Sequence, residues 1–369
     1  MNPRCRIAAA VLMLQLALPG WSQILIGQTA GMTGSVAASV NETIGGAQLY
    51  LDAINAQGGV HGERIEVLRM DDAFDVKRAG ENARVLIEEK KVVALFMSRG
   101  TPHTQAIVPW LDKNDVVLIA PSTGAMVLHQ PVLRHVFNVR STYQREAEKA
   151  VAHLLTIGVD RIAVVHVTDS FGADALEGAM NGFRKAKAAP AIDVPADRDK
   201  PDYAAIVARI VGADAKAVLW IGSGTAVVDG VKALRGAGSR AQVVTLSNNA
   251  SSGFIKQLGE HSAGVIVTQV FPNERSIGHP MVKEALALAN AKGQQELSPA
   301  ALEGFASAKV LVEALRRTGP KPTRARLLAA LENLRAYDLG GLEVGYSPQD
   351  HTGIDFADLS IISGGRFKR

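Results

Sequence analysis

Short hydrophobic runs alternate along the chain with longer segments that have helical periodicity. The runs are rich in Val, Ile and Leu, and they read ILIG, RIEVLRM, VVALF, VVLIA, RIAVVHV, AVLWI, QVVTL and GVIVTQV. Strands that are apolar at nearly every position are typical of parallel sheets covered by helices on both faces. The segments between them suit the crossover helices of such a sheet. The pattern therefore predicts an α/β fold built from doubly wound, Rossmann-like sheets.

Local signals mark where two of the helices begin. Ser39 and Glu42 stand three residues apart, in the form of a capping box. Thr101 and Pro102 are placed as the N-cap and first residue of a later helix. We therefore expect helices to begin near Ser39 and Thr101, each directly after a loop of small residues.

The strand candidates are too many for one sheet of ordinary size. Polar stretches interrupt the alternation at Val136–Gln144, Gln269–Ser276 and Tyr337–Gly341. Three interruptions predict two lobes joined by a three-segment hinge. The predicted boundaries are residues 23–140 plus 272–338 for the first lobe, and residues 141–271 plus 339–369 for the second.

The first 22 residues have the order of a signal peptide. MNPRCR is basic, IAAAVLMLQLAL is an apolar run, and PGWS ends in small residues. The run is too short to cross a bilayer. Cys5 is the single cysteine and precedes the apolar run, whereas the cysteine of a lipid anchor would follow it. We therefore expect cleavage after residue 22 and a periplasmic protein that is not a lipoprotein.

The composition is that of a packed globular protein. Hydrophobic residues make up 47% of the 369 residues, charged residues 21%, and the formal net charge is +4. Basic and acidic residues alternate instead of forming a basic stripe, so no nucleic-acid or membrane partner is expected. The motifs of nucleophile elbows, zinc proteases, P-loops and dinucleotide sites do not occur. We expect a monomer with no metal, no cofactor and no catalytic residue.

Loops rich in small polar residues follow several of the predicted strands. In open α/β sheets the ligand binds at the carboxyl ends of the strands, where helix N-termini offer free N–H groups to anions. Arg99 stands in one of these loops, where a guanidinium is either solvated or recruited for an anion. The loops are Gly31–Ser35, Ser98–Thr101, Ser122–Gly124, Asp169–Gly172 and Ser247–Asn249.

Several longer motifs together resemble one protein family. They are GQTAGMTGSVAASVNETIGGAQLYLDAINAQGGVHG, MSRGTPHT, APSTGA, HVTDSFGADALEGAMNGFR and DHTGIDFADLSII. With them the chain resembles the periplasmic solute-binding proteins of ABC transporters, of the branched-chain amino acid (Leu/Ile/Val) type. The resemblance covers essentially all of the chain after the signal peptide. It implies the type I periplasmic-binding fold, with two lobes that close on a ligand.

The resemblance also implies a set of ligand contacts. In the family, a small hydroxyl residue and a Pro-small-small-small turn hold the ligand's carboxylate. An aromatic residue before a glycine and two further positions contribute from the second lobe. Together with neighbouring loop residues, the candidate ligand-binding residues are Arg99, Gly100, Thr101, Ser122, Thr123, Gly124, Phe171, Ser223, Ser247 and Asn248.

Position 247 departs from the family pattern. Amino-acid binders of this type carry an acidic residue there for the ligand's ammonium, and this chain has Ser247. A buried ammonium without a counter-charge costs several kcal/mol. The expected ligand is therefore a small carboxylate, aromatic or amide-bearing, with branched-chain amino acids as the family default. An inner-membrane ABC permease is the expected partner. A ligand-sensing receptor of the same fold and a hydrolase remain alternatives.

Overall fold

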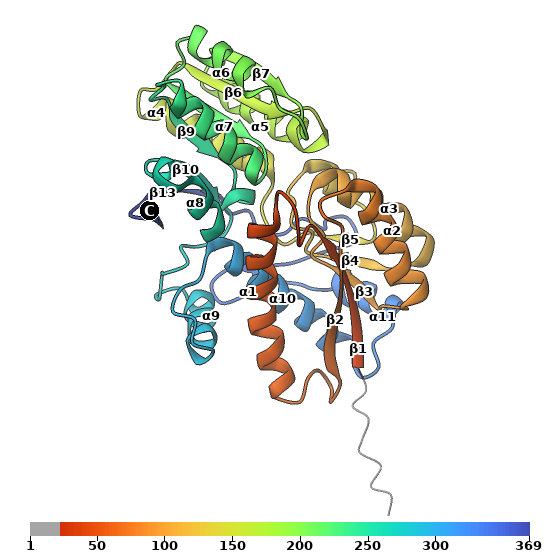
Figure 1. Ribbon diagram of the computed structural model, residues 1–369. Coiled ribbons are helices and arrows are strands. Elements are labelled where there is room, and N and C mark those ends of the chain that lie inside the picture. The colour runs from red at the N-terminus through yellow and green to blue at the C-terminus, as the bar shows by residue number, and fades with distance from the viewer. Residues whose placement is uncertain (1–22) are drawn as a thin grey trace, which may run out of the picture.

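A computed structural model describes residues 23–369, and the predicted signal peptide lies outside these residues. The chain forms two α/β lobes, one built mainly from the red-to-yellow and blue parts of the chain and the other mainly from the green part (Figure 1). The prediction of two doubly wound lobes is confirmed.

The first lobe contains a five-stranded parallel sheet in the order β2-β1-β3-β4-β5. Its strands are β1 (Gln23–Ala30), β2 (Arg64–Asp71), β3 (Ala94–Phe96), β4 (Val117–Ile119) and β5 (Val136–Phe137). Its helices are α1 (Ala37–Ala56), α2 (Val76–Arg84), α3 (Thr101–Asn114), α9 (Pro280–Ala291), α10 (Pro299–Thr318) and α11 (Arg324–Glu332).

The second lobe contains a seven-stranded sheet in the order β14-β13-β10-β9-β8-β6-β7. The last two strands of the chain are the antiparallel ones. The strands are β6 (Ile162–Val167), β7 (Ile192–Ala196), β8 (Ala217–Ile221), β9 (Gln242–Thr245), β10 (Ile266–Gln269), β13 (Asp358–Ser363) and β14 (Arg366–Lys368). The helices are α4 (Tyr143–Thr156), α5 (Ser170–Lys185), α6 (Tyr203–Gly212), α7 (Thr225–Gly236) and α8 (Ser252–Leu258).

Alternate strand residues enter cores on opposite faces of each sheet. In the first lobe, Phe96 packs with α1 and α10, whereas its neighbour Leu95 packs with α2 and α3. In the second lobe, Val165 packs with α6 and α7, and its neighbour Val164 packs with α4 and α5. Burial on both faces explains why the strands are apolar at nearly every position.

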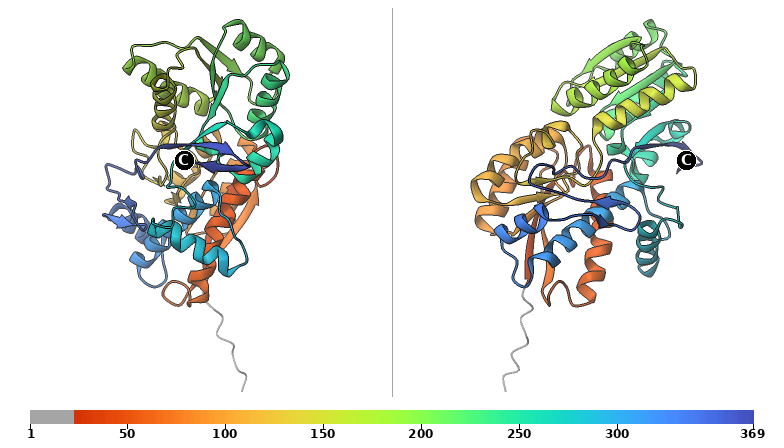
Figure 2. Two further views of the ribbon diagram at one scale, coloured as in Figure 1. Left: turned by 90° about the vertical axis from the view of Figure 1, so that its left-hand side faces the viewer. Right: turned by 180° about the vertical axis from the view of Figure 1, so that it is seen from behind.

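The chain passes between the lobes three times. The first passage joins β5 to α4 and the second joins β10 to α9. The third lies after Ile354, because Leu339, Val344 and Tyr346 still pack in the core of the first lobe. There the predicted break around Tyr337–Gly341 forms a small hairpin, β11 (Tyr337–Asp338) with β12 (Glu343–Val344). The predicted change of lobe at residue 339 is therefore about fifteen residues early. Figure 2 shows the blue C-terminal segment running on to the second lobe.

The capping box predicted at the start of α1 does not form. The helix begins at Ala37, and the Ser39 hydroxyl donates to the carbonyl of Val36 (3.1 Å). The Glu42 carboxylate instead accepts from the backbone N–H groups of Ser252 (2.9 Å) and Gly253 (2.8 Å). Glu42 therefore caps α8 of the other lobe, a partner that local spacing cannot reveal.

Gly224 sets how closely the two lobes approach. A Cβ atom at this position would lie 1.9 Å from the carbonyl oxygen of Ser35 in the first lobe. The backbone of Gly224 has φ 55° and ψ −129°, and Gly259 has nearly the same conformation, φ 58° and ψ −128°. No atom lies within 4 Å of a Cβ added at Gly259. The two glycines therefore share the same backbone strain and differ in the contact between lobes.

We expect Gly224→Ala to hold the lobes apart, whereas Gly259→Ala should lower stability without opening them. Small-angle scattering should give a larger radius of gyration for Gly224→Ala than for Gly259→Ala. Equal radii for the two variants would show that the Gly224–Ser35 contact does not limit closure.

Candidate ligand-binding site

The carboxyl ends of the strands in the two sheets face each other at the boundary between the lobes. The N–H of Thr225, at the start of α7, donates to the carbonyl of Ser35 in the loop after β1 (3.1 Å). The N–H of Ala300, at the start of α10, donates to the carbonyl of Ala250, in the loop after β9 (3.0 Å). The strand-end loops therefore converge on a shared interface, where buried polar side chains meet.

Arg99 reaches from the first lobe into this interface. It follows β3, is 4% exposed, and its Nη2 donates to the carbonyl oxygen of Asn248 in the second lobe (2.7 Å). The guanidinium also donates to the hydroxyls of Ser122 (3.2 Å) and Ser39 (3.3 Å). Among the described residues, no carboxylate forms an ion pair with Arg99. Burial lowers the pKa of Arg99, yet a guanidinium keeps its charge in proteins. The interface therefore contains a buried cation held only by neutral oxygens.

Two threonines of the strand-end loops in the first lobe form a hydroxyl pair. The Oγ1 atoms of Thr101 and Thr123 lie 2.7 Å apart, and both side chains are buried. Thr101 is not the N-cap that the sequence predicts: α3 is capped by Gly100, which has φ 91°. The loop after β4 is followed by a 3₁₀ turn rather than the predicted helix. Its Gly124 instead accepts a hydrogen bond from the N–H of Tyr143, at the start of α4 (2.8 Å).

A buried ion pair lies on the second-lobe side. Arg140 is 1% exposed, and its Nη2 pairs with Glu146 and donates to the hydroxyl of Ser247 (2.9 Å). Glu146 is fully buried and also accepts from the N–H of Ser247 (2.9 Å) and from the hydroxyl of Thr268. Burial opposes the charge of Arg140, but the carboxylate of Glu146 raises the pKa of Arg140 above its usual value. Ser247 therefore contacts both members of an ion pair, which leaves no free carboxylate at that position for a ligand ammonium.

The remaining predicted residues of the second lobe are part of the same network. Asn248 donates from Nδ2 to the carbonyl of Gly222 (2.9 Å) and to the hydroxyl of Ser223 (3.0 Å). Phe171 is buried in the lobe's core, with its ring edge-on to that of Tyr143 at 4.7 Å. The Tyr143 ring in turn lies 4.5 Å from the Arg140 guanidinium. The structure thus brings the predicted residues of both lobes into one connected cluster.

The N–H groups at the start of α5 are already used by the chain itself. The Asp169 carboxylate accepts from the N–H groups of Phe171 (2.9 Å) and Gly172 (3.0 Å). Its other oxygen pairs with Arg198, whose guanidinium also lies 5.3 Å from the ring of Phe74 in the first lobe. The prediction that this helix start offers free donors to an anion is therefore wrong.

A cavity of about 440 Å³ opens beside the cluster, between the lobes. Ser35 and Phe74 line it from the first lobe, and Ser223, Arg198 and Tyr203 are among the second-lobe residues that line it. Ser223 connects this cavity to Asn248, and Asn248 connects it to Arg99. The cavity is of the size that binds small organic molecules.

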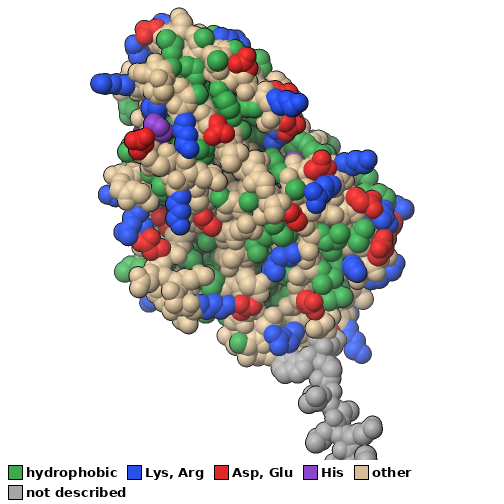
Figure 3. Space-filling view, viewed as in Figure 1, with side chains coloured by type: hydrophobic (Ala, Val, Ile, Leu, Met, Phe, Trp, Pro, Cys, Tyr) green, Lys and Arg blue, Asp and Glu red, His purple; other side chains and the backbone are tan. Residues whose placement is uncertain are grey.

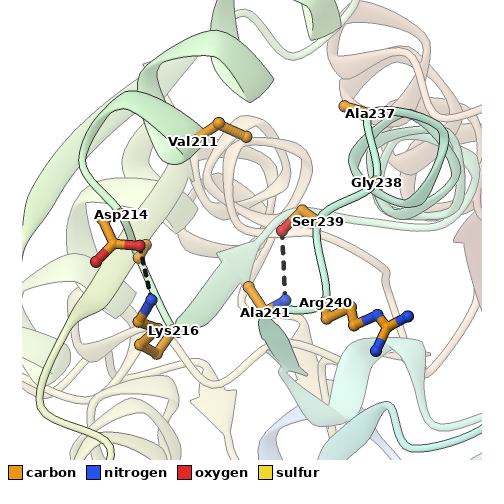
Figure 4. Close-up of a pocket in the computed structure, with 9 residues that line it drawn as sticks. Val211, Asp214, Lys216, Ala237, Gly238, Ser239, Arg240 and Ala241 are labelled. Carbon is orange, nitrogen blue, oxygen red and sulfur yellow. Dashed lines mark hydrogen bonds and ion pairs between the residues drawn. The ribbon is translucent and has the colours of Figure 1, made fainter.

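At least one further hollow lies away from this interface. One of about 330 Å³, shown in Figure 4, is lined by Asp214, Lys216, Ser239 and their neighbours. These residues precede β8 and β9, so the hollow lies at the amino ends of the strands, opposite the end where α/β sheets bind ligands. On the face shown in Figure 3, basic and acidic side chains are interspersed over both lobes.

Sequence reasoning missed five charged or aromatic residues of the site. Arg140 and Tyr143 lie at the passage between β5 and α4. Arg140 closely follows a strand, and this position could have indicated it. Glu303 stands in a stretch of α10 that is buried from Pro299 to Val312, where a charge is unusual. For Glu146 and Arg198, no sequence signal separates them from ordinary helix and loop charges.

Residues 23–369 contain no group of three or more His, Cys, Asp or Glu side chains arranged to hold a metal ion. Over the same residues, no helix combines the length and the apolar character that crossing a membrane requires.

Comparison with known proteins gives a consistent match. The model of the "Periplasmic binding protein" family matches residues 23–360. A Leu/Ile/Val-binding protein homolog from Brucella melitensis is 24% identical over 327 residues, covering 86% of this chain and 85% of that protein. The Leu/Ile/Val-binding protein of Escherichia coli K12 is 22% identical over 249 residues, 67% of each chain.

Solved structures agree with this match. A substrate-binding periplasmic protein from Ralstonia solanacearum has 30% identity and a TM-score of 0.85, over 92% of this chain and 98% of that one. A branched-chain amino acid ABC transporter protein from Thermus thermophilus with bound valine has 17% identity and a TM-score of 0.82, over 95% of each chain. The chain belongs to the periplasmic binding protein family. It is a non-catalytic solute-binding protein of ABC transport.

The buried pair of Arg140 and Glu146 gives a stability prediction. Glu146→Gln leaves the Arg140 guanidinium without a counter-charge, which should lower the free energy of unfolding by about 3–5 kcal/mol. Glu148→Gln, on the same helix, breaks only an ion pair with the exposed Lys185 and should cost less than about 1 kcal/mol. Denaturant titration measures both, and equal losses would contradict the assigned role of Glu146.

A second prediction concerns Asp72, which follows β2. Its carboxylate accepts from the hydroxyl of Thr29 (3.1 Å) and the N–H of Phe74 (2.8 Å), and burial raises the pKa of Asp72 to about 6. This pKa exceeds the usual value of 3.8. The stabilising contribution of Asp72 is therefore complete below pH 3.8 and is lost as the pH rises through about 6.

Lowering the pH from 7.5 to 5 should therefore raise the melting temperature through Asp72, and Asp72→Asn should reduce that rise by about 2 °C. Differential scanning fluorimetry across this pH range checks the expectation. Asp160→Asn, at an exposed position, serves as the control. The same pH dependence in both variants would contradict the assignment.

Proposed function

We propose that the chain is the extracytoplasmic receptor of an ABC importer and captures a small organic acid between its two lobes. The acid is a branched-chain amino acid or a similar compound, or an aromatic or amide-bearing carboxylate. The signal peptide directs the chain to the periplasm, where it works as a monomer and delivers its ligand to an inner-membrane permease. The names of the Brucella and Escherichia relatives and the valine-bound Thermus structure support this assignment.

The observation that carries the proposal is the buried, unpaired guanidinium of Arg99. A buried charge is costly unless an opposite charge compensates it, and within the described residues Arg99 contacts only hydroxyls and the Asn248 carbonyl. A ligand carboxylate would supply the missing charge. Hydrogen bonds to ionised groups contribute about 1.5–3 kcal/mol each, more than the neutral contacts that they replace.

Closure follows from the contacts that the two lobes share. Arg99 belongs to the first lobe, whereas Asn248, Ser247 and Ser223 belong to the second, so a ligand in this interface touches both. A ligand with contacts to both lobes favours the closed state by its differential affinity. A dissociation constant near 1 μM corresponds to about −8 kcal/mol, which a few charge-assisted hydrogen bonds and apolar burial can supply.

Replacing Arg99 tests the proposal. Arg99→Ala should weaken binding of a small carboxylate at least tenfold, because it removes charge-assisted hydrogen bonds of about 1.5–3 kcal/mol. Isothermal titration of the exported chain with leucine, phenylalanine, benzoate and benzamide measures the loss. Arg145→Ala removes an exposed arginine that pairs with Asp355 and should leave affinity unchanged. Unaltered binding by Arg99→Ala, or binding of benzamide alone, would contradict the proposed function.

A further inference from the structure

Glu303 is a buried acid with no ion-pair partner among the described residues. It is 7% exposed, on the part of α10 that is buried from Pro299 to Val312. The other charged residue of that stretch, Lys309, pairs with Glu284. The Oε1 atom of Glu303 accepts a hydrogen bond from the hydroxyl of Ser122 (2.7 Å). The first lobe thus contains a buried carboxylate that forms no ion pair within residues 23–369 and accepts its hydrogen bond from a hydroxyl.

Ser122 places this anion beside the cation of Arg99. The Ser122 hydroxyl accepts from Arg99 Nη1 (3.2 Å) and donates to Glu303 Oε1 (2.7 Å). The guanidinium nitrogen and the carboxylate oxygen are therefore at most about 6 Å apart, with one hydroxyl between them. Neither group is part of an ion pair, so the first lobe presents a positive and a negative pole side by side.

Near Ser247 and the start of α5, the acids of the second lobe are already paired. The Glu146 carboxylate is committed to Arg140, Ser247 and Thr268. Asp169 is committed to Arg198 and to the start of α5. Near Ser247 a cationic group on the ligand would therefore meet a closed ion pair, whereas near Ser122 it would meet the Glu303 carboxylate, which forms no ion pair in the described part of the chain.

Two buried atoms on the second-lobe side of the interface indicate what else the ligand offers. Arg140 Nη1 and Asn248 Oδ1 are both buried and have no hydrogen-bond partner. The first requires an acceptor and the second a donor, and each unmet group carries a desolvation cost. A ligand that combines a carboxylate with N–H groups meets both requirements.

We propose that Glu303 binds the cationic group of the ligand and makes the site selective for zwitterions in which a carboxylate and an ammonium are attached to the same carbon atom. This inference rests on the proposed function and narrows it: the ligand is an amino acid, and simple organic anions are rejected. Glu303, in the first lobe, then binds the ammonium that an acidic residue at position 247 binds in the family pattern. Both charged groups of the ligand are then bound by one lobe, and the second lobe closes over them.

Paired ligands of equal shape test the inference. Isothermal titration of the exported chain compares L-leucine with L-2-hydroxyisocaproate and L-phenylalanine with L-3-phenyllactate, which replace the ammonium by a hydroxyl. The wild-type chain should bind one amino acid at least tenfold more tightly than its hydroxy acid. Glu303→Gln should remove most of that preference by lowering the affinity for the amino acid, while the affinity for the hydroxy acid falls by less than about threefold or rises.

Two further variants separate recognition from folding. Glu313→Gln removes a partly exposed acid from the same helix and should keep the full preference. Glu303→Asp keeps the charge and should retain part of the preference for the amino acid. The ratio of the two affinities in one protein is independent of the folded fraction, so a purely structural role for Glu303 would leave the ratio unchanged.

The outcomes distinguish the two proposals. A wild-type chain that binds hydroxy acids as tightly as amino acids, or a Glu303→Gln variant that keeps the preference, overturns the zwitterion inference and leaves the receptor function standing. A chain that binds none of these acids, nor benzoate, overturns the proposed function and the inference with it.

Discussion

A buried positive charge that lacks a carboxylate partner is the constraint on which the rest of this site depends. Arg99 projects from the end of β3 into the boundary between the lobes and donates a hydrogen bond to the Asn248 carbonyl of the opposite lobe. A guanidinium there is costly unless an anion joins it. The fold places it there because parallel strands in both lobes end at the same boundary, and their loops can only meet across it.

The other charges of the interface are arranged around this cation. Arg140 and Glu146 compensate each other within the second lobe and fix the environment of Ser247. Glu303 lies on the first-lobe side, one hydroxyl from Arg99. One lobe therefore carries separated, unpaired charges and the other a closed ion pair. This asymmetry supports the proposal that the first lobe binds the ligand's charges and that the second lobe contributes shape and closure.

Much of the fold could be predicted from the sequence, because strands buried on both faces leave a hydrophobic pattern that few other structures produce. Strand-end loops could be found for the same reason. What failed were inferences from local spacing: Glu42 caps a helix of the other lobe, and Thr101 follows its helix's cap instead of forming it. The partner of Glu303 could not be found, since Ser122 is 181 positions away along the chain. Local spacing carries no information about such contacts.

The most direct test of the account is a thermodynamic cycle between Arg99 and the ligand's carboxylate. Isothermal titration measures the affinities of a bound acid and of its uncharged primary amide, each for the wild-type chain and for Arg99→Met. A charge-assisted contact predicts a coupling energy of at least about 1.5 kcal/mol, because each single change removes the same interaction. A coupling energy near zero would show that Arg99 does not contact the carboxylate and would contradict the central claim.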